Sequence, residues 1–267
     1  MKIAILGDGG WGTTLAIHLF NKSFKVCLWS AFKEYALILD RKRVNPRYLP
    51  GIEIPRGIQV TSDLKEAVLE KDLLVLAIPS PYLRKILKKL KNIKEARTKI
   101  YLSVIKGIEN KTLKRVSEVI YDELGKVKLA VLSGPTIAYE VAKGLPTTAV
   151  IASRDRNLRK ELQRIFMNKN FRIYTNDDVV GVELGGSLKN VIAIACGVSD
   201  GLGFGTNAKA ALLARGLVEI TRLGVKLGAK PQTFNGISGL GDLVTTCISP
   251  YSRNRFVGEQ IGKGKTL

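Results

Sequence analysis

Short apolar runs alternate with amphipathic patterns over the first two thirds of the chain. Apolar residues recur at helical spacing in five segments, at 13–22, 63–70, 81–90, 111–124 and 155–167. Between them lie runs with the length and β-branched content of strands: KIAILG (2–7), KVCLWS (25–30), GIQVTS (57–62), LLVLAIP (73–79), TKIYLSVI (98–105), LAVLSG (129–134), TTAVIAS (147–153) and FRIYTN (171–176). The runs 73–79 and 129–134 are continuously apolar, as in strands covered on both faces. This alternation predicts a parallel, doubly wound α/β sheet.

The pattern changes after the last of these runs. Only helical periodicity follows, at 179–197, 206–228 and 239–247, joined by glycine-rich turns such as DGLGFGTN. We therefore expect an α/β domain over 1–178 and an all-helical domain over 179–267. The sequence stops at GKGKTL, in what resembles the start of another helical unit, so we expect the helical domain to be incomplete.

Composition indicates a soluble globular protein, with 45% hydrophobic and 25% charged residues. No apolar run approaches the roughly 20 residues of a membrane span, so none is expected. The start MKIAILGDGG enters a strand pattern directly and lacks the regions of a signal peptide, which favours the cytoplasm. Cys27, Cys196 and Cys247 are far apart and not in CxxC spacing, so we predict free buried thiols and no metal site.

The formal net charge of +20 fits either a nucleic-acid-binding protein or a lysine-rich protein that acts on anions. Much of the excess lies at 84–94, 110–116 and 154–164, where Lys and Arg alternate with apolar residues as on a solvated helix face. No basic stripe studded with aromatic residues occurs. We therefore expect no nucleic-acid partner, and a salt-dependent DNA-binding assay would test that rival.

A glycine motif, Gly7-Asp8-Gly9-Gly10-Trp11-Gly12, follows the first predicted strand and opens the first predicted helix. In this context Gly7 permits the tight turn, Gly9 lets the backbone approach a pyrophosphate, and Gly12 lets the helix pack on the strand. The helix N-terminus offers free N–H groups to phosphates. An ordinary glycine-rich turn is the alternative. Strand, spacing and helix together favour a Rossmann-type dinucleotide-binding domain over 1–178.

The end of the second strand leaves the choice between NAD and NADP open. NAD sites commonly place Asp or Glu there to hold the ribose 2′-hydroxyl, but this strand ends Leu-Trp-Ser-Ala-Phe-Lys. Ser30 and Lys33 could accommodate a 2′-phosphate, which would favour NADP. Phe32 and Lys33 could equally be plain surface residues.

A nicotinamide-dependent dehydrogenase needs a group that exchanges a proton with the carbonyl oxygen. The only histidine, His18, lies inside the first helix, where packing on the sheet or a solvent-facing position is expected. Tyr139 and Lys143 fit the YxxxK pair of short-chain dehydrogenases. Those enzymes carry a differently spaced glycine motif and an upstream serine, so we interpret this match as chance.

Two lysines remain in unusual settings. Lys189 shares a helix face with glycines and small apolar side chains, where burial would lower its pKa enough for acid–base work near neutrality. Gly185 and Gly186 are expected to clear space beside it, whereas extension to the surface is the alternative. Lys106 follows an apolar strand at the edge where open α/β folds bind ligands, although alone it resembles an exposed loop lysine.

Polar residues of the last segment complete the candidate site. Asp242 lies four residues before Thr246, so both can face one site, with a helix N-cap as the alternative role for Asp242. Ser252-Arg253-Asn254 offers a guanidinium and an amide that suit a phosphate.

Long motifs now indicate a family. GDGGWGTTLA, NPRYLPG, VIKGIE, SGPTIAYEVAKGLPT, ELGGSLKNVIAIACGVSDGLGFGTNAKAAL, GLGDLVTTC and SRNR occur in this order. Together they resemble the bacterial NAD(P)-dependent glycerol-3-phosphate dehydrogenases along essentially the whole chain. The resemblance implies reversible reduction of dihydroxyacetone phosphate to sn-glycerol 3-phosphate for lipid synthesis, with NAD or NADP as the cofactor. A related dehydrogenase for another hydroxy acid or 6-phosphogluconate is the rival, which a substrate panel would separate.

The resemblance also implies roles for single residues. Lys189 matches the catalytic proton donor and acceptor, and Lys106 matches a lysine that contacts both substrate and cofactor. Further substrate contacts are implied for Gly134, Thr136 (often serine in the family), Asp242, Ser252, Arg253 and Asn254. Further cofactor contacts are implied for Gly10, Trp11, the region of Ala31, Ala138 and Arg253. Family members often have arginine near Ala31, and its absence weakens the case for NADP. They also continue some tens of residues beyond Leu267, into a tail that reaches the cofactor. A homodimer is expected.

Overall fold

The computed structural model describes residues 1–96 and 99–266. Its main sheet has eight strands in the order β10-β9-β8-β7-β6-β1-β2-β5. They are β1 (Lys2–Leu6), β2 (Lys25–Trp29), β5 (Gln59–Thr61), β6 (Leu73–Leu76), β7 (Ile100–Ser103), β8 (Lys128–Ser133), β9 (Thr147–Ala152) and β10 (Phe171–Asn176). Each coincides with one of the predicted runs, although Thr98 at the start of the predicted strand 98–105 lies outside the described residues. The strand positions predicted from the sequence are confirmed.

The sheet is mixed, so the prediction of an all-parallel sheet was wrong at one edge. β9 runs antiparallel to β8, while β10 is parallel to β9 and all other neighbours are parallel. A parallel crossover usually needs a helix that covers a face of the sheet. The β8–β9 connection instead holds the short helix α6 (Ala138–Ala142), which packs on α1. The chain therefore returns in the opposite direction.

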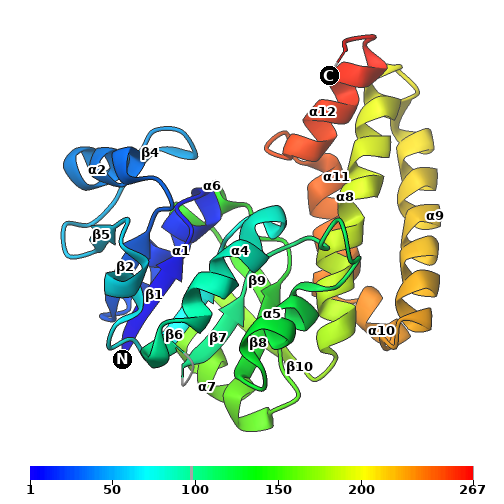
Figure 1. Cartoon of the computed structure of the whole chain (residues 1–267). Coiled ribbons are helices and arrows are strands. Elements are labelled where there is room, and N and C mark those ends of the chain that lie inside the picture. The colour runs from blue at the N-terminus through cyan, green and yellow to red at the C-terminus, as the bar shows by residue number, and fades with distance from the viewer. Residues whose placement is uncertain (97–98, 267) are drawn as a thin grey trace.

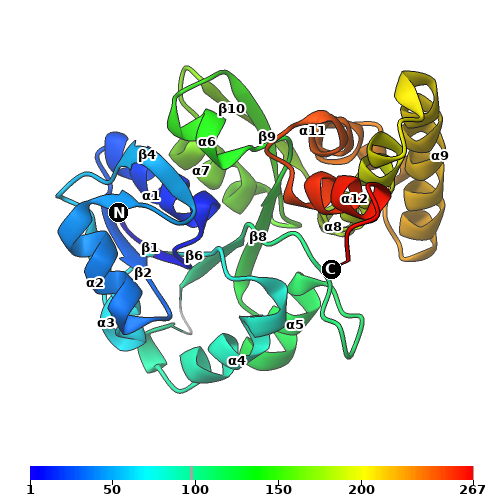
Figure 2. The same ribbon diagram turned by 90° about the horizontal axis from the view of Figure 1, so that it is seen from above.

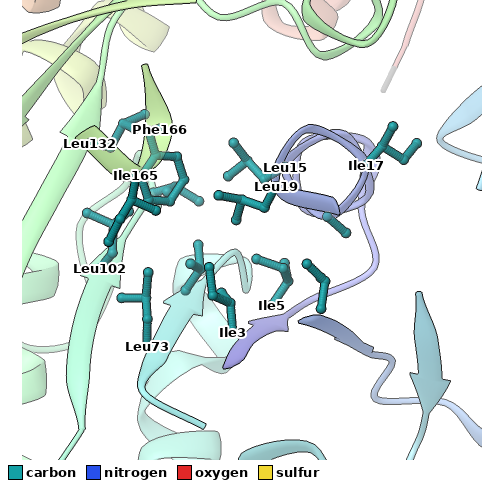
Figure 3. Close-up of a cluster of buried hydrophobic side chains, with 14 of the residues drawn as sticks. Ile3, Ile5, Leu15, Ile17, Leu19, Leu73, Leu102, Leu132, Ile165 and Phe166 are labelled. Carbon is teal, nitrogen blue, oxygen red and sulfur yellow. The ribbon is translucent and has the colours of Figure 1, made fainter. Parts of the chain in front are cut away.

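Helices cover both faces of the sheet (Figures 1 and 2). α1 (Gly10–Asn21) and α7 (Arg156–Phe166) pack on one face, and α3 (Leu64–Val68), α4 (Ser80–Lys91) and α5 (Val116–Leu124) on the other. Ile3 and Ile5 face the first layer, while Ala4 and Leu6 face the second, which explains the continuous apolar run of β1. Figure 3 shows Leu15 and Leu19 of α1 in the apolar core between this helix layer and the sheet.

The small elements α2, β3 and β4 were not predicted. α2 (Lys33–Lys42) buries only Ala36 and Leu39, so it has no continuous apolar stripe. β3 (Val44–Asn45) and β4 (Leu49–Glu53) form a short antiparallel pair in which Pro50 and Gly51 hide the strand pattern. Short or weakly buried segments of this kind carry little periodicity.

The remaining chain is helical and lies beside the sheet (Figure 1). Its elements are α8 (Val179–Gly201), α9 (Gly205–Lys226), α10 (Pro231–Phe234), a π-helical turn (Ile237–Gly241), α11 (Asp242–Ile248) and α12 (Arg253–Gly262). The predicted helices at 179–197, 206–228 and 239–247 correspond to α8, α9 and the π turn with α11. α10 and α12 were not predicted.

α8 is the one helix of the described chain that is long and apolar enough to cross a membrane, with a mean hydropathy of 1.5. The sequence-based expectation that no apolar segment is long enough to span a membrane was therefore wrong for α8. Half of its most apolar window is buried inside the protein, and α9, α11 and α12 pack against it. Its apolar surface thus forms the centre of the helical region, as in the core helix of a globular protein.

α8 and α12 meet main chain to main chain through four glycines, Gly197 and Gly201 on α8 and Gly258 and Gly262 on α12. A Cβ atom at Gly197 would lie 2.0 Å from the Arg255 carbonyl oxygen, and one at Gly258 would lie 2.1 Å from that of Ile194. No larger residue fits at either position without moving a backbone. This contact fixes the distance between the two helices.

A buried carboxylate joins α8 to the sheet region. Glu183 is 7% exposed and accepts hydrogen bonds from the Ser117 backbone N–H (2.7 Å), the Ser117 hydroxyl (2.6 Å) and Arg115 Nη1 (2.8 Å). Ser117 belongs to the first turn of α5, whose N–H groups have no partner within the helix. Glu183 therefore supplies a hydrogen-bond acceptor for the first turn of α5 and attaches that helix to α8.

Replacing Glu183 with glutamine should lower the free energy of unfolding by about 2 kcal/mol, because charge-assisted hydrogen bonds to Arg115 and Ser117 become neutral ones. Urea unfolding followed by circular dichroism measures the change. Glu161→Gln, on the exposed side of α7, is the matched control and should have almost no effect. Equal stability of the two variants would contradict the role assigned to Glu183.

Candidate active site

The carboxyl ends of β7 and β8 lie against α8. Lys106 follows β7 and Gly134 follows β8, at the sheet edge where ligands of open α/β folds bind. A Cβ atom at Gly186 of α8 would lie 2.4 Å from Ser133 Oγ and 3.4 Å from Lys106 Cγ. Residues from three separate elements are thereby brought to one place.

Lys189 is buried at the centre of this cluster, with 5% of its surface exposed. Its ammonium group donates to Asp242 Oδ1 and, at 2.7 Å, to the Thr246 hydroxyl. The side chain does not extend to solvent, which excludes the surface alternative. Thr246 donates to the Asp242 carbonyl oxygen at 2.7 Å, so the two residues face one site, as their spacing predicted.

Asp242 joins the two lysines. Its carboxylate is almost fully buried, and Oδ2 lies 2.8 Å from Lys106 Nζ in the geometry of an ion pair rather than of an aligned hydrogen bond. Lys106 Nζ also donates to the Gly134 carbonyl oxygen at 2.8 Å and to Thr136 Oγ1 at 3.4 Å. The N-cap of α11 is Gly241, and the Asp242 carboxylate accepts from no backbone N–H among the described residues. Asp242 is therefore not a helix cap.

The glycines beside Lys189 do not leave an empty space, contrary to expectation. A Cβ atom at Gly185 would lie 2.6 Å from the Ser238 carbonyl oxygen of the π turn. The equivalent position at Gly186 is taken by Ser133 and Lys106. Both glycines thus allow close approach of neighbouring elements, which brings Asp242 and Lys106 to Lys189.

The surroundings of Lys189 lower its pKa from the ordinary lysine value to about 7. Burial of the ammonium group is the largest cause, and the charge of Lys106 adds to it, while Asp242 acts in the opposite direction. A lysine with this pKa is partly protonated at neutral pH. It can therefore both donate and accept a proton there.

The glycine loop has the geometry that a bound pyrophosphate requires. Gly7 has a φ of +124°, and a Cβ atom there would lie 2.5 Å from the Ala77 carbonyl oxygen. Gly12 abuts the Gly7 carbonyl oxygen, whereas the position beside Gly9 is open within 4 Å. α1 begins at Gly10 with no side-chain cap, so its first N–H groups are available.

Other cofactor candidates surround this loop. Trp11 lies in the first turn of α1, and its buried indole N–H has no hydrogen-bond partner among the described residues. Gly10 faces the Tyr48 backbone and the Ala138 side chain, and the Ala138 carbonyl oxygen accepts from Thr14 Oγ1 at 3.0 Å. Ala31 is exposed just beyond β2. The residues present fit a dinucleotide.

The α12 candidates lie at the N-terminus of that helix. Ser252 is its N-cap and accepts from the Arg255 N–H at 3.2 Å, while Arg253 is exposed. Asn254 donates to Asn190 Oδ1 at 2.8 Å, beside Lys189 in the sequence. Asn190 was not singled out from the sequence, because its partner comes from an unpredicted helix. Within the described chain no hydrogen bond or ion pair joins Ser252 or Arg253 to Lys189, Lys106 or Asp242.

Residues set aside in the sequence lie outside this cluster. His18 is buried, and its Nε2 is 2.7 Å from the Phe166 carbonyl oxygen, which confirms the packing role. Lys143 Nζ lies 4.5 Å from the centre of the Tyr139 ring, and that ring packs against Tyr251. The three cysteines are free and buried, as predicted. No group of three potential metal ligands occurs in the described ranges.

Family profiles match nearly the whole chain. The profile described as NAD-dependent glycerol-3-phosphate dehydrogenase N-terminus matches residues 2–159, and its C-terminus counterpart matches residues 178–267. The chain belongs to the NAD-dependent glycerol-3-phosphate dehydrogenase family. The resemblance inferred from the motifs is confirmed.

Individual relatives agree with the family. A glycerol-3-phosphate dehydrogenase (NAD(P)+) of Fusobacterium nucleatum is 49% identical over 269 residues, which cover 100% of this chain and 80% of that protein. The Thermoanaerobacter sp. protein of the same name is 51% identical over 267 residues, with the same coverage. The chain therefore spans about four fifths of the length of these relatives.

Solved structures of the family share the fold. The crystal structure of glycerol-3-phosphate dehydrogenase from Coxiella burnetii has a TM-score of 0.95 and 41% identity, covering 99% of this chain and 81% of that chain. This confirms the predicted Rossmann-type sheet followed by a helical region. D-mandelate dehydrogenase, at 13% identity and a TM-score of 0.62, shows likeness of fold alone.

Proposed function

We propose that Lys189, Asp242 and Lys106 carry out the proton transfer in the reaction of this family. That reaction is the reversible, NAD(P)H-dependent reduction of dihydroxyacetone phosphate to sn-glycerol 3-phosphate, which supplies glycerophospholipid synthesis. One observation carries the proposal. A lysine with a pKa lowered to about 7 lies buried against a carboxylate that it shares with a second lysine.

Each side chain has a distinct part in the proposed chemistry. Lys189 gives a proton to the C2 oxygen in reduction and takes it back in oxidation. Asp242 holds the ammonium group in place, while burial and, after it, the positive charge of Lys106 keep the pKa of Lys189 low. Lys106, Gly134 and Thr136 bind the substrate from the sheet edge, and Asp242 contacts it from α11. Ser252, Arg253 and Asn254 bind its phosphate, because they offer an exposed guanidinium and an amide at a helix N-terminus.

NAD or NADP supplies the hydride when bound. The loop of Gly7, Gly9, Gly10 and Gly12 holds the pyrophosphate, supported by the free N–H groups of α1. Trp11 lies beside this loop, in the first turn of α1. Ala31, Ala138, Lys106 and Arg253 complete the proposed contacts with the cofactor.

The proposal also covers the domain boundaries, the oligomeric state and the location in the cell. We assign residues 1–178 to the dinucleotide-binding domain and 179–267 to the helical domain, because the sheet ends at Asn176 and α8 begins at Val179. A homodimer would cover Val218, Leu223 and Val225, which α9 exposes. Free, buried cysteines support a cytoplasmic location.

Steady-state assays test the function directly. NADH and NADPH are each offered with dihydroxyacetone phosphate, and NAD+ and NADP+ are each offered with 6-phosphogluconate as a substrate control. Oxidation of either reduced nucleotide with dihydroxyacetone phosphate alone is expected. Absence of turnover with both nucleotides would contradict the proposal.

The two directions of the reaction should have opposite pH dependence. Reduction needs protonated Lys189, so kcat/KM for dihydroxyacetone phosphate should fall as the pH rises through about 7. Oxidation needs the neutral amine, so kcat/KM for glycerol 3-phosphate should rise over the same range. The limiting slopes are about tenfold per pH unit. Profiles at constant ionic strength measure this, and the absence of an inflection near neutrality in both directions would contradict Lys189 as the proton carrier.

A further inference from the structure

The adenosine end of the glycine loop lacks the usual acid. In NAD sites of this fold, an Asp or Glu at the end of the second strand accepts a hydrogen bond from the ribose 2′-hydroxyl. Here β2 ends at Trp29, and the next residue, Ser30, is fully buried. The position that normally carries the negative charge is therefore occupied by a neutral hydroxyl.

A carboxylate from the glycine loop reaches this position instead. Asp8 Oδ2 accepts a hydrogen bond from Ser30 Oγ at 2.5 Å. The Asp8 carbonyl oxygen accepts from Asn45 Nδ2 at 2.7 Å and from Thr13 Oγ1 at 3.3 Å. Asp8 is thus held both at its side chain and at its backbone, with its charge at the end of β2.

The Asp8 carboxylate can accept further hydrogen bonds. It is half-buried, and within the described chain Ser30 is its only side-chain partner and no cation pairs with it. Burial raises its pKa, and the hydrogen bond from Ser30 acts in the opposite direction. Its second oxygen, Oδ1, accepts no hydrogen bond from any other described residue. An ionised carboxylate with a free oxygen can accept a donor from a ligand.

The hydrogen bond from Ser30 to Asp8 argues against a phosphate-binding role for Ser30. From the sequence, Ser30 with Lys33 could have accommodated a 2′-phosphate. A hydroxyl has a single proton, and the shortest contact of Ser30 Oγ directs it to Asp8. Ser30 therefore presents no donor to a phosphate, and Lys33 at the start of α2 is the only remaining part of that alternative.

We propose that Asp8 makes this chain prefer NAD(H), because its carboxylate accepts a hydrogen bond from the adenosine 2′-hydroxyl and repels the 2′-phosphate of NADP(H). The inference rests on the proposed function, since it requires the dinucleotide to bind at the glycine loop. A hydroxyl beside a carboxylate makes a charge-assisted hydrogen bond. A phosphate in the same place brings like charges together in a half-buried setting.

Equilibrium binding tests the proposal independently of turnover. Isothermal titration calorimetry of the full chain with NADH and with NADPH gives the ratio of their dissociation constants. The wild-type chain should bind NADH at least about tenfold more tightly. Asp8→Asn keeps the size and the acceptor for Ser30 but removes the charge. It should shift the ratio toward NADPH by about tenfold, and Asp8→Ala should shift it in the same direction.

Two control variants define the outcomes. Asp40→Asn removes the same charge from α2, where the Asp40 side chain is 49% exposed, and should leave the ratio unchanged. Lys33→Gln tests the alternative. Equal changes in both affinities in Asp8→Asn would overturn the proposal. So would tighter NADPH binding by the wild-type chain that disappears in Lys33→Gln. Binding of neither nucleotide to a folded wild-type chain would instead overturn the proposed site itself.

Discussion

Replacing Lys189 with methionine is expected to reduce kcat for dihydroxyacetone phosphate by about 10²- to 10⁴-fold, the usual range for loss of a general acid. Methionine has a similar length, and Lys106 still pairs with the buried Asp242 carboxylate, so folding should be retained. Affinity for the cofactor should not change, because within the described chain no hydrogen bond or ion pair joins Lys189 to the glycine loop. Its partners are Asp242 and Thr246.

Single-turnover kinetics and calorimetric binding of the cofactor together measure this result. Lys189→Arg is an informative companion, because arginine keeps the charge but does not release its proton. It should be as inactive as the methionine variant. Lys226→Met makes the same exchange at an exposed position of α9 and should retain full activity. Turnover near the wild-type rate in either Lys189 variant would exclude this lysine as the proton donor.

Replacing Asp242 with asparagine should affect both stability and pH dependence. The change leaves Lys189 and Lys106 facing each other without a carboxylate, and breaking a buried ion pair costs about 3–5 kcal/mol. Asp242 raises the pKa of Lys189 against the effects of burial and Lys106. Its loss should therefore lower that pKa further and move the fall of the reduction rate below pH of about 7.

Urea unfolding and pH profiles of kcat/KM measure the two effects. Asp177→Asn is the matched control, because its partner Lys230 is exposed and such pairs contribute at most about 1 kcal/mol. Adding Lys106→Met to Asp242→Asn removes one uncompensated cation and should restore part of the stability. An Asp242→Asn variant with wild-type stability and an unchanged pH profile would show that the carboxylate does not hold the two lysines together.

The fold was largely predictable because most elements bury a regular apolar face. The eight strands of the main sheet are bounded runs of this kind, such as 73–79. α2 and β3–β4 bury too little side-chain surface to show a period. The direction of β9 depends on where α6 packs, and α6 contacts α1 more than a hundred residues earlier in the chain. Local patterns carry no information about such contacts.

The site was predictable in parts. Lys189 was found because a charge interrupts an apolar helix face. Its contact with Asp242 spans 53 residues and depends on the π turn that precedes α11. No periodic pattern in the sequence predicts that turn. Asp8 was hidden for another reason. It occupies a variable position of the glycine motif, and only the fold brings it to Ser30.

The glycine contact between α8 and α12 fixes the position of α12 relative to Lys189. Gly197 lies eight residues beyond Lys189 on the same helix, about 12 Å along its axis. α12 is registered against that helix by main-chain atoms, and Asn254 meets Asn190 at its start. The separation between Lys189 and the N-terminus of α12 is therefore set by backbone contact at the four glycines. In the proposed function, Lys189 transfers the proton and the start of α12 binds the phosphate, so this backbone contact would fix the distance between the two ends of the substrate.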